Sequence, residues 1–153
     1  MDNEDKQAWC SYGEKQEIKF IEGRQVSGWN LRLNPEKKSN KYVHDLTAIC
    51  PVDLKTMKTP FRTSWKYGIP PSRAVTINKK DFVRYAKLYP NIIILCDVQY
   101  MNRMFIVTVD RARKLIKAEK ARLHTYKNRK FDDKGNALDS YVFDVNDLDE
   151  VHG

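Results

Sequence analysis

The chain has few cysteines and no apolar run long enough to cross a membrane. Its three cysteines, Cys10, Cys50 and Cys96, lack the paired spacing of a disulfide framework or a Cys-based zinc site. They indicate a reducing compartment, and we expect a cytoplasmic protein. The apolar run Ile92–Cys96 is far shorter than the roughly 20 residues that a membrane-spanning helix needs, so we expect no membrane partner. The acidic and polar start, MDNEDKQAW, does not resemble a signal peptide.

The composition is that of an ordinary folded protein. The 153 residues are 41% hydrophobic and 31% charged, without internal repeats or low-complexity tracts. This length is enough to bury a sizeable core and predicts a single domain over residues 1–153.

Acidic residues are scarce in the middle of the chain and dense at its end. Residues 55–130 carry nineteen Lys and Arg against four Asp and Glu, a net charge of +15. Residues 131–153 carry one Lys against seven Asp and Glu, a net charge of −6. A basic body with an acidic tail favours a polyanionic partner, although many lysines serve only to keep a surface solvated.

Hydrophobic periodicity predicts helices alternating with strands. The expected helices span residues 11–22, 79–88 and 110–126, and the expected strands span 25–33, 42–49, 52–57, 91–98, 104–109 and 140–145. We expect a loop over 59–71 and a turn over 132–136. This order predicts the α/β class, with a mixed central β-sheet flanked by helices.

Several residues have the properties of helix ends. Ser11 followed by Glu14 is a capping-box pattern, and Gly23 could end the first helix. Asn78 is the expected cap of the second helix, which stops before Pro90.

The most informative pattern is His44-Asp45-Leu46 followed by Asp53-Leu54-Lys55 on two successive predicted strands. Mg²⁺ prefers oxygen ligands and needs only one or two carboxylates when a phosphate supplies another oxygen. Asp45 and Asp53 are the natural pair, because the Cys50-Pro51 break would join their strands in a tight hairpin.

The spacing of Asp53 and Lys55 puts both on one face of a strand, since residues i and i+2 point the same way. We expect Val52 and Leu54 to face the core. Lys55 could then orient a water and offset charge on a phosphate. The alternative is a surface hairpin in which Asp53 and Lys55 form an ion pair contributing under about 1 kcal/mol.

On these residues the chain resembles the PD-(D/E)xK nuclease superfamily, whose core is restriction-endonuclease-like. Asp45 matches the first aspartate of the motif, and Asp53-Leu54-Lys55 matches its (D/E)xK element. The resemblance covers residues 11–98 and leaves 101–153 as an elaboration. His44 stands where the motif has Pro, and the spacing between the two aspartates is short. The resemblance implies a nuclease that uses Mg²⁺ or Mn²⁺ to hydrolyse phosphodiester bonds.

The family also uses an acid on the first helix, which maps onto Glu17 or Glu14. Glu17 borders the apolar stripe formed by Phe20 and Ile21, whereas Glu14 also suits a capping role. We therefore expect the catalytic set Asp45, Asp53, Lys55 and Glu17, with Asp45, Asp53 and Glu17 as metal ligands. Either glutamate could instead be a solvated helix residue.

Cations that could hold a nucleic acid follow this motif. The expected nucleic-acid-binding residues are Lys58, Arg62, Lys66, Arg73, Lys79, Lys80 and Arg84. Phe61, Trp65 and Tyr67 are interleaved with the first of them, and aromatic rings can stack on exposed bases or simply pack on the core. His44 and His124 are expected to have structural roles.

These features predict a small DNA endonuclease of phage or mobile-element type, in the cytoplasm of a bacterial host if phage-encoded, and possible as a homodimer. The alternatives are a catalytically inactive nucleic-acid- or protein-binding module on the same scaffold, and an RNA-cleaving enzyme.

Overall fold

The computed structural model describes residues 6–23, 28–127 and 139–152, and it divides the chain into two compact units. The first unit comprises residues 1–50 and the second residues 51–153. Each is described by itself, and the single domain over 1–153 stays a prediction. The turn expected over 132–136 lies outside the described residues.

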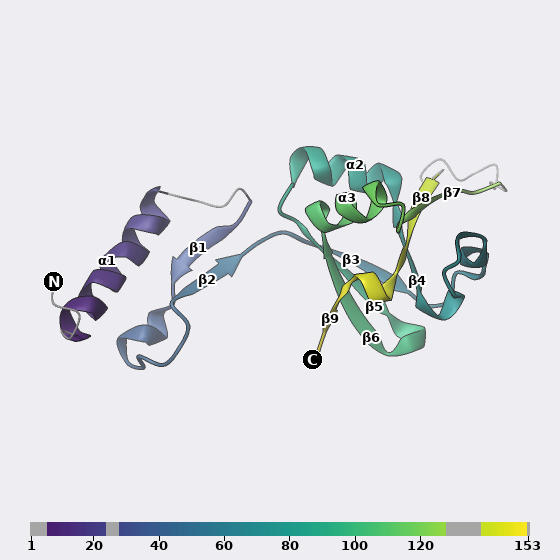
Figure 1. The fold of residues 1–153 in the computed structure, drawn as a ribbon. Coiled ribbons are helices and arrows are strands. Elements are labelled where there is room, and N and C mark those ends of the chain that lie inside the picture. The colour runs from purple at the N-terminus through teal and green to yellow at the C-terminus, as the bar shows by residue number, and fades with distance from the viewer. Residues whose placement is uncertain (1–5, 24–27, 128–138, 153) are drawn as a thin grey trace. The chain divides into compact units, whose positions relative to one another are not determined.

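The first unit consists of a helix and a two-stranded antiparallel sheet (Figure 1). Its elements are α1 (Lys6–Gly23), β1 (Asn30–Leu33), the 3₁₀ helix η1 (Pro35–Lys38) and β2 (Leu46–Ile49). The helix ends at Gly23 as predicted, but it begins before Ser11. Ser11 is therefore inside the helix and does not cap it.

The connection from β1 to β2 is fixed by Asn34. Its side-chain amide donates to the His44 carbonyl at 3.0 Å, and its carbonyl oxygen accepts from the Glu36 backbone at 3.1 Å. Asn34 and Leu31 are the buried residues of this unit among those described. The unit consequently has little core of its own.

The second unit contains two sheets, two α-helices and several short 3₁₀ turns. Its strands are β3 (Val52–Met57), β4 (Ala74–Asn78), β5 (Ile93–Val98), β6 (Arg103–Thr108), β7 (Arg122–Thr125), β8 (Asp139–Asp144) and β9 (Asp149–Val151). Its helices are α2 (Lys79–Leu88) and α3 (Val109–Lys117), with 3₁₀ turns η2 (Arg62–Tyr67), η3 (Pro71–Arg73), η4 (Gln99–Met101) and η5 (Val145–Asp147).

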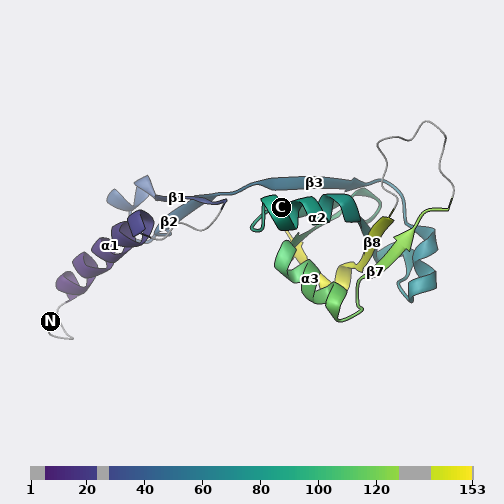
Figure 2. The same ribbon diagram turned by 90° about the horizontal axis from the view of Figure 1, so that it is seen from above.

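One sheet has the order β3-β5-β6-β9 and the other β4-β8-β7. The β3–β5 pair is parallel and the remaining pairs are antiparallel, so the four-stranded sheet is mixed. Figure 2 shows α2 and α3 side by side within this unit. Both helices share one hydrophobic core with the two sheets, as expected for the α/β class.

Burial of one face of each element holds this core together. Ile94, Cys96 and Val98 alternate along β5 and are fully buried, and Phe105 and Val107 of β6 lie in the same cluster. Such residues contribute about 1.5–3 kcal/mol each when removed from water. The apolar stretch predicted over 91–98 is therefore an inner strand, paired on both sides.

The predicted hairpin between the strands that flank Cys50-Pro51 is wrong. Among the described strands, β2 pairs with β1 and β3 pairs with β5. Asp45 also lies just before β2 instead of within it. The Pro breaks strand pairing, because it lacks the N–H that a ladder needs.

The helix predicted over 110–126 is also shorter than expected. It ends at Lys117, and Glu119 adopts a left-handed backbone conformation with φ of 56°. The backbone N–H groups of Lys120 and Ala121 then donate to the Leu115 carbonyl, which closes the helix. The segment that follows forms β7, because β8 offers it a strand to pair with.

At Asn78, the position of the α2 cap is confirmed but not its chemistry. The Asn78 side chain makes no capping hydrogen bond. Its Oδ1 instead accepts from the buried Ser140 hydroxyl at 3.1 Å and so ties β4 to β8.

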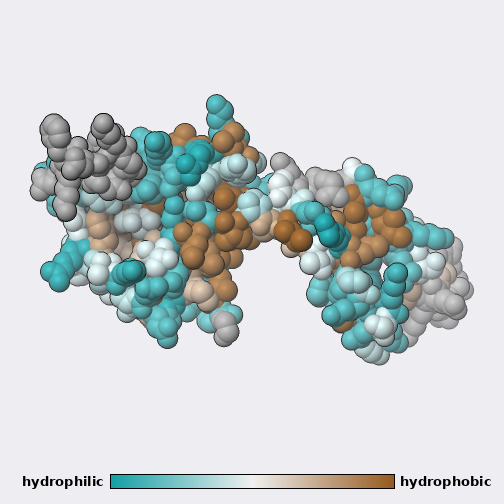
Figure 3. All heavy atoms as spheres, turned by 180° about the vertical axis from the view of Figure 1, so that it is seen from behind, coloured by the Kyte–Doolittle hydropathy of each residue, from teal (hydrophilic) through white to brown (hydrophobic). Residues whose placement is uncertain are grey.

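The two faces of the edge strand β3 are exposed and buried in the reverse of the predicted order. Val52 and Leu54 are 54% and 58% exposed, whereas Asp53 and Lys55 are half-buried. Figure 3 shows hydrophobic residues gathered on the surface of this unit. The two polar side chains can face inward because they compensate each other's charge.

No helix in the described ranges combines the length and apolar composition required to span a bilayer.

Candidate functional site

Asp53 and Lys55 lie on one face of β3, as their spacing predicts. Asp53 is in register with Ile94 and Lys55 with Cys96, so both polar residues border the hydrophobic core. The Lys55 Nζ lies 3.0 Å from Asp53 Oδ2. Two charged groups are therefore held at the margin of the core by a regular strand, where few rotamers are open to them.

A third charged residue completes this arrangement from α2. The Lys55 Nζ donates to Asp81 Oδ2 at 2.7 Å, which is closer than its contact with Asp53. Asp81 Oδ1 accepts from the Arg84 guanidinium at 2.9 Å. We call Asp53, Lys55, Asp81 and Arg84 the Lys55 cluster. Its carboxylates and lysine are each less than a quarter exposed.

The Lys55 cluster keeps its ammonium protonated. Burial lowers the pKa of Lys55, but the hydrogen bond to Asp81 and then the contact with Asp53 raise it more, so the net direction is above its ordinary value. Lys55 therefore carries a positive charge at neutral pH and is suited to donate hydrogen bonds to an oxyanion or a water. It is not suited to act as a general base.

Asp53 retains unused capacity to bind a ligand. Its Oδ2 is buried and, within the described part of the chain, the 3.0 Å ion pair leaves it without a hydrogen bond of good geometry. Burial and then a hydrogen bond with Asp53 raise the pKa of Tyr85. The Tyr85 phenol therefore stays protonated beside this carboxylate. A carboxylate oxygen has more than one lone pair, so Oδ2 can accept from a further ligand while Lys55 stays beside it.

The first unit contains a similar arrangement, which we call the Lys37 cluster. The Lys37 Nζ donates to both Glu17 oxygens, at 2.7 and 2.9 Å, and also to Asp45 Oδ1. The hydrogen bonds to Asp45 and then Glu17 raise the pKa of Lys37. Glu17 and Asp45, both predicted metal ligands, thus converge on one cation. Glu14 is exposed, and the choice of Glu17 over Glu14 as the helix acid stays a prediction.

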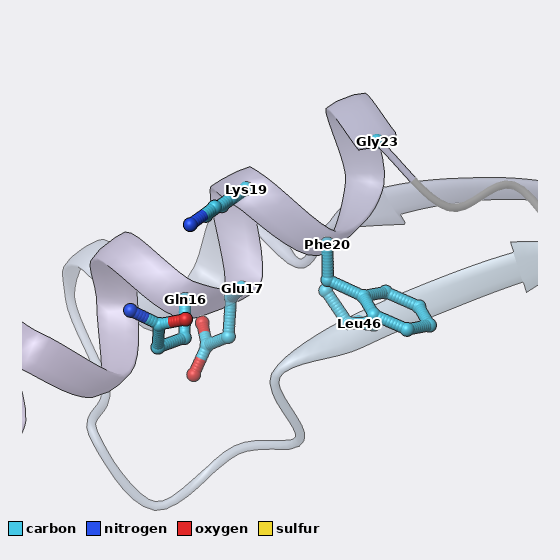
Figure 4. Close-up of a pocket in the computed structure, with 6 residues that line it drawn as sticks. All are labelled: Gln16, Glu17, Lys19, Phe20, Gly23 and Leu46. Atoms are coloured by element: carbon cyan, nitrogen blue, oxygen red, sulfur yellow. The ribbon is translucent and has the colours of Figure 1, made fainter.

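Glu17 also lines an open pocket within the first unit. The pocket has a volume of about 620 Å³ and is lined by Gln16, Glu17, Lys19, Phe20, Gly23 and Leu46 (Figure 4). Its lining comes from α1 and the start of β2. The Glu17 side chain that lines it is 20% exposed.

The donor chemistry of both clusters suits a hard divalent cation, because it consists of carboxylate oxygens. Asp53 Oδ2, buried and without a hydrogen bond, is the clearest acceptor for such an ion. In the residues that the structure describes, however, no three His, Cys, Asp or Glu side chains gather closely enough to hold a metal ion. Lysine ammonium groups sit against the carboxylates instead.

The predicted nucleic-acid-binding cations fall into two groups. Arg73 is paired with Asp144 at 2.8 Å, and Arg84 is paired with Asp81 and lies over the Tyr85 ring. The remaining residues are exposed, apart from the half-buried Lys79, and form no salt bridge in the described part of the chain: Lys58, Arg62, Lys66, Lys79 and Lys80. The second group is available to an external anion.

The structure places the remaining reactive side chains outside any catalytic arrangement. His124 is 9% exposed, its ring packs edge-on against Phe61 at 5.1 Å, and its Nδ1 lies 2.8 Å from the Tyr67 hydroxyl. Burial raises the pKa of Cys96 to about 12, so this thiol is inert. His44 is exposed and lies 3.4 Å from the Thr47 hydroxyl.

Sequence reasoning missed two members of the clusters, Asp81 and Lys37, and also Tyr85, which lies beside Asp53. Asp81 looked like an ordinary acid in the first turn of α2, Tyr85 like a core residue, and Lys37 like part of a polar turn. The parallel pairing of β3 with β5 was the available clue. It places the helix between these two strands over the face that carries Asp53 and Lys55.

Comparisons with known proteins give one weak similarity. No family model matches the chain, and no curated protein matches it. Among solved structures, a nuclease from a fusselovirus is similar, with 11% identity and a TM-score of 0.42 over 94% of this chain and 84% of that one. We draw no conclusion about function from a similarity at this level.

Proposed function

We propose that the chain is a divalent-cation-dependent nuclease that hydrolyses phosphodiester bonds in DNA as an endonuclease. In this proposal the carboxylates that bind Mg²⁺ or Mn²⁺ are Asp53 in the second unit and Asp45 and Glu17 in the first, and Lys55 aligns the attacking water. The proposal keeps the resemblance to the PD-(D/E)xK superfamily, whose motif acids match these positions.

The observation that carries the proposal is the pairing of Asp53 with Lys55 on the inner face of β3. A strand edge gains nothing in stability by burying a carboxylate oxygen without a hydrogen bond, as it does at Asp53 Oδ2. A protonated amine held 3.0 Å away supplies the opposite charge without using that oxygen's hydrogen-bonding capacity. An acceptor and a donor side by side are what a phosphodiester and its attacking water require.

The charge of each side chain determines its role in the proposed reaction. A bound divalent cation would supply Lewis-acid activation of the phosphodiester. Lys55 stays protonated, orients the water and offsets negative charge as it develops on the phosphate. Asp81 holds the Lys55 amine at 2.7 Å and so fixes its direction. The protonated Tyr85 phenol beside Asp53 can donate a hydrogen bond to that carboxylate.

The charge distribution supports a nucleic acid as the substrate. The predicted binding cations Lys58, Arg62, Lys66 and Lys80 are exposed and form no salt bridge within the described residues. Cations of this kind bind phosphates through release of counterions. We also propose that the protein is encoded by a phage, acts in the cytoplasm of its bacterial host and forms a homodimer.

A second candidate function is nucleic-acid binding without cleavage. It is favoured by the ion pairs of both clusters, which already satisfy much of the carboxylate charge. Such a protein would bind DNA in a salt-dependent manner and remain inert with every divalent cation.

The test is cleavage of a supercoiled plasmid by the purified chain in Mg²⁺, Mn²⁺ or EDTA. We expect cleavage in either cation and none in EDTA. Asp53→Asn and Lys55→Met should each lower the rate about 100-fold or more, because each removes a group acting on the reacting phosphate.

A matched acid–lysine pair elsewhere serves as the control. Asp110 and Lys114 form an exposed ion pair at 2.8 Å on α3, and Asp110→Asn and Lys114→Met should cleave like the wild type. Plasmid binding without cleavage in any cation would select the second candidate. Preference for an RNA of the same sequence would instead identify an RNA-cleaving enzyme.

A further inference from the structure

Trp65 is a large aromatic side chain that the fold leaves in solvent. It lies on η2 and is 65% exposed. Its aromatic neighbours on the same segment, Phe61 and Tyr67, are turned inward and pack with Ile69 and Val142. A Trp is usually well buried in a folded protein, so an exposed one beside two half-buried aromatics needs a reason.

The segment that presents Trp65 is held firmly. Ser64, its neighbour in the chain, is fully buried, and Gly68 ends the 3₁₀ helix in the left-handed conformation with φ of 72°. The Tyr67 hydroxyl and the Phe61 ring both contact His124 of β7. A ring on a rigid support loses little conformational entropy when a ligand stacks on it.

Cations lie near Trp65 along the chain, and residues 58–73 contain no acid. Arg62 and Trp65 are three residues apart on a 3₁₀ helix, so their side chains lie on one side of it. Lys66 follows directly and is exposed. Residues 58–73 contain four Lys and Arg and no Asp or Glu. The chemistry of this surface is an aromatic face flanked by positive charge.

We propose that Trp65, Arg62 and Lys66 form a stacking platform for an unpaired base of single-stranded DNA. The indole stacks on the base, and the two cations contact the phosphates on either side. In a duplex the base faces are covered by their neighbours, so a surface indole can stack only on a base outside the helix. The inference rests on the proposed function for the choice of DNA, and it deepens that function by naming single-stranded DNA or a single-stranded junction as the substrate class.

The test measures binding in EDTA, where no cleavage occurs, with the full chain, a fluorescein-labelled dT20 oligonucleotide and a 20-base-pair duplex. Fluorescence anisotropy at one fixed salt concentration gives both dissociation constants. We expect Trp65→Ala to weaken dT20 binding about 5- to 100-fold and to change duplex binding less than about twofold. Trp65→Phe should retain most of the affinity, because a phenyl ring also stacks.

A second measurement does not depend on affinity alone. Binding of dT20 should quench the tryptophan fluorescence of the wild type, and the quenching should be lost in Trp65→Phe. Tyr89→Ala is the control, since Tyr89 is an aromatic residue of the same unit that is 47% exposed, and it should bind dT20 like the wild type.

The proposal is overturned if Trp65→Ala binds dT20 normally, if it loses both DNA forms equally, or if the wild type does not bind dT20. These results are separable from the test of cleavage. A chain that binds dT20 through Trp65 and cuts nothing would keep this inference and refute the nuclease. A chain that cuts plasmid while Trp65→Ala binds dT20 unchanged would do the reverse.

Discussion

The two clusters share one chemical arrangement and differ in what supports it. Each places two carboxylates on one lysine ammonium. The Lys37 cluster stands on a 3₁₀ turn in a unit where, among the described residues, only Leu31 and Asn34 are buried. The Lys55 cluster stands on a regular strand above a core that runs through two sheets and two helices.

The comparison distinguishes a cluster that only pairs opposite charges from one in which the fold also fixes the positions of the charged side chains. A short unit with little core buries too little apolar surface to fix long side chains, whereas a strand in register with buried residues restricts them. Asp45 is 59% exposed in the side chain, and the corresponding Asp53 is 24% exposed. Of the two, the Lys55 cluster is therefore the better support for chemistry that depends on geometry.

The largest expected effect comes from removing core volume. Phe105→Ala should lower the free energy of unfolding of the second unit by about 3–5 kcal/mol, because Phe105 is 2% exposed and its loss leaves a cavity. Leu31→Ala, in the first unit, should cost about 2 kcal/mol, the low end for such changes, since its surroundings can collapse. Urea unfolding followed by circular dichroism measures both. Equal losses would contradict the contrast between the two units.

The next effect concerns Asp81 and tests positioning directly. Asp81→Asn should lower kcat about tenfold and leave KM unchanged, because it misdirects the Lys55 amine without touching the substrate. It should also cost about 1–3 kcal/mol of unfolding free energy, since a hydrogen bond between charged groups is lost. Single-turnover cleavage and urea unfolding give the two values.

Two further variants sharpen this result. Asp81→Glu should recover part of kcat, because it restores a carboxylate near Lys55. Arg84→Met removes the other partner of Asp81 and should change kcat little. If Asp81→Asn raised KM with kcat unchanged, Asp81 would act in substrate binding, and the positioning role would be wrong.

Local signals were sufficient to predict some elements to the residue. The bounds of β3 (Val52–Met57) and α2 (Lys79–Leu88) agree with the sequence prediction. Their ends are marked by residues with strong backbone preferences, namely Pro51 before the strand and Pro90 after the helix.

Other features depended on partners that are distant in sequence. The segment after Lys117 continues an amphipathic pattern, yet it becomes β7 because β8 is there to pair with it. The alternation along β3 was evident, but not which side would be buried. The inward turn of Lys55 is stabilised by Asp81, 26 residues away, and no local pattern contains that information.

The candidate site likewise combines features set by local sequence with contacts that only the tertiary fold creates. The sequence predicted that Asp53 and Lys55 share a face, since that depends only on the period of a strand. Their inner neighbours, Asp81 and Tyr85, come from a helix that only the tertiary fold brings over β3. Convergence of Asp45 and Asp53 on one ion stays a prediction.

A smaller effect is expected at Lys37. If Glu17 and Asp45 hold a cation as proposed, the Lys37 ammonium competes with it for the same oxygens. Lys37→Met should therefore raise the affinity for Mn²⁺, measured by electron paramagnetic resonance titration of the free ion. Lys38→Met, next in the chain and exposed, is the matched control and should leave the affinity unchanged. A lower affinity in Lys37→Met would argue against these two acids as ligands.

The smallest expected effect is a difference between the two units in how their stability depends on pH. Burial and then the nearby charge of Lys66 lower the pKa of His124 below 6.5 in the folded state. The unfolded chain therefore binds a proton more readily, and stability falls as the pH drops from 6.5 toward the folded pKa, while it is constant above 6.5. His124→Asn should remove this part of the acid sensitivity in urea unfolding of the second unit. His44→Asn is the matched control, because His44 belongs to the first unit. An unchanged pH dependence in His124→Asn would mean that other groups cause the acid sensitivity of the second unit.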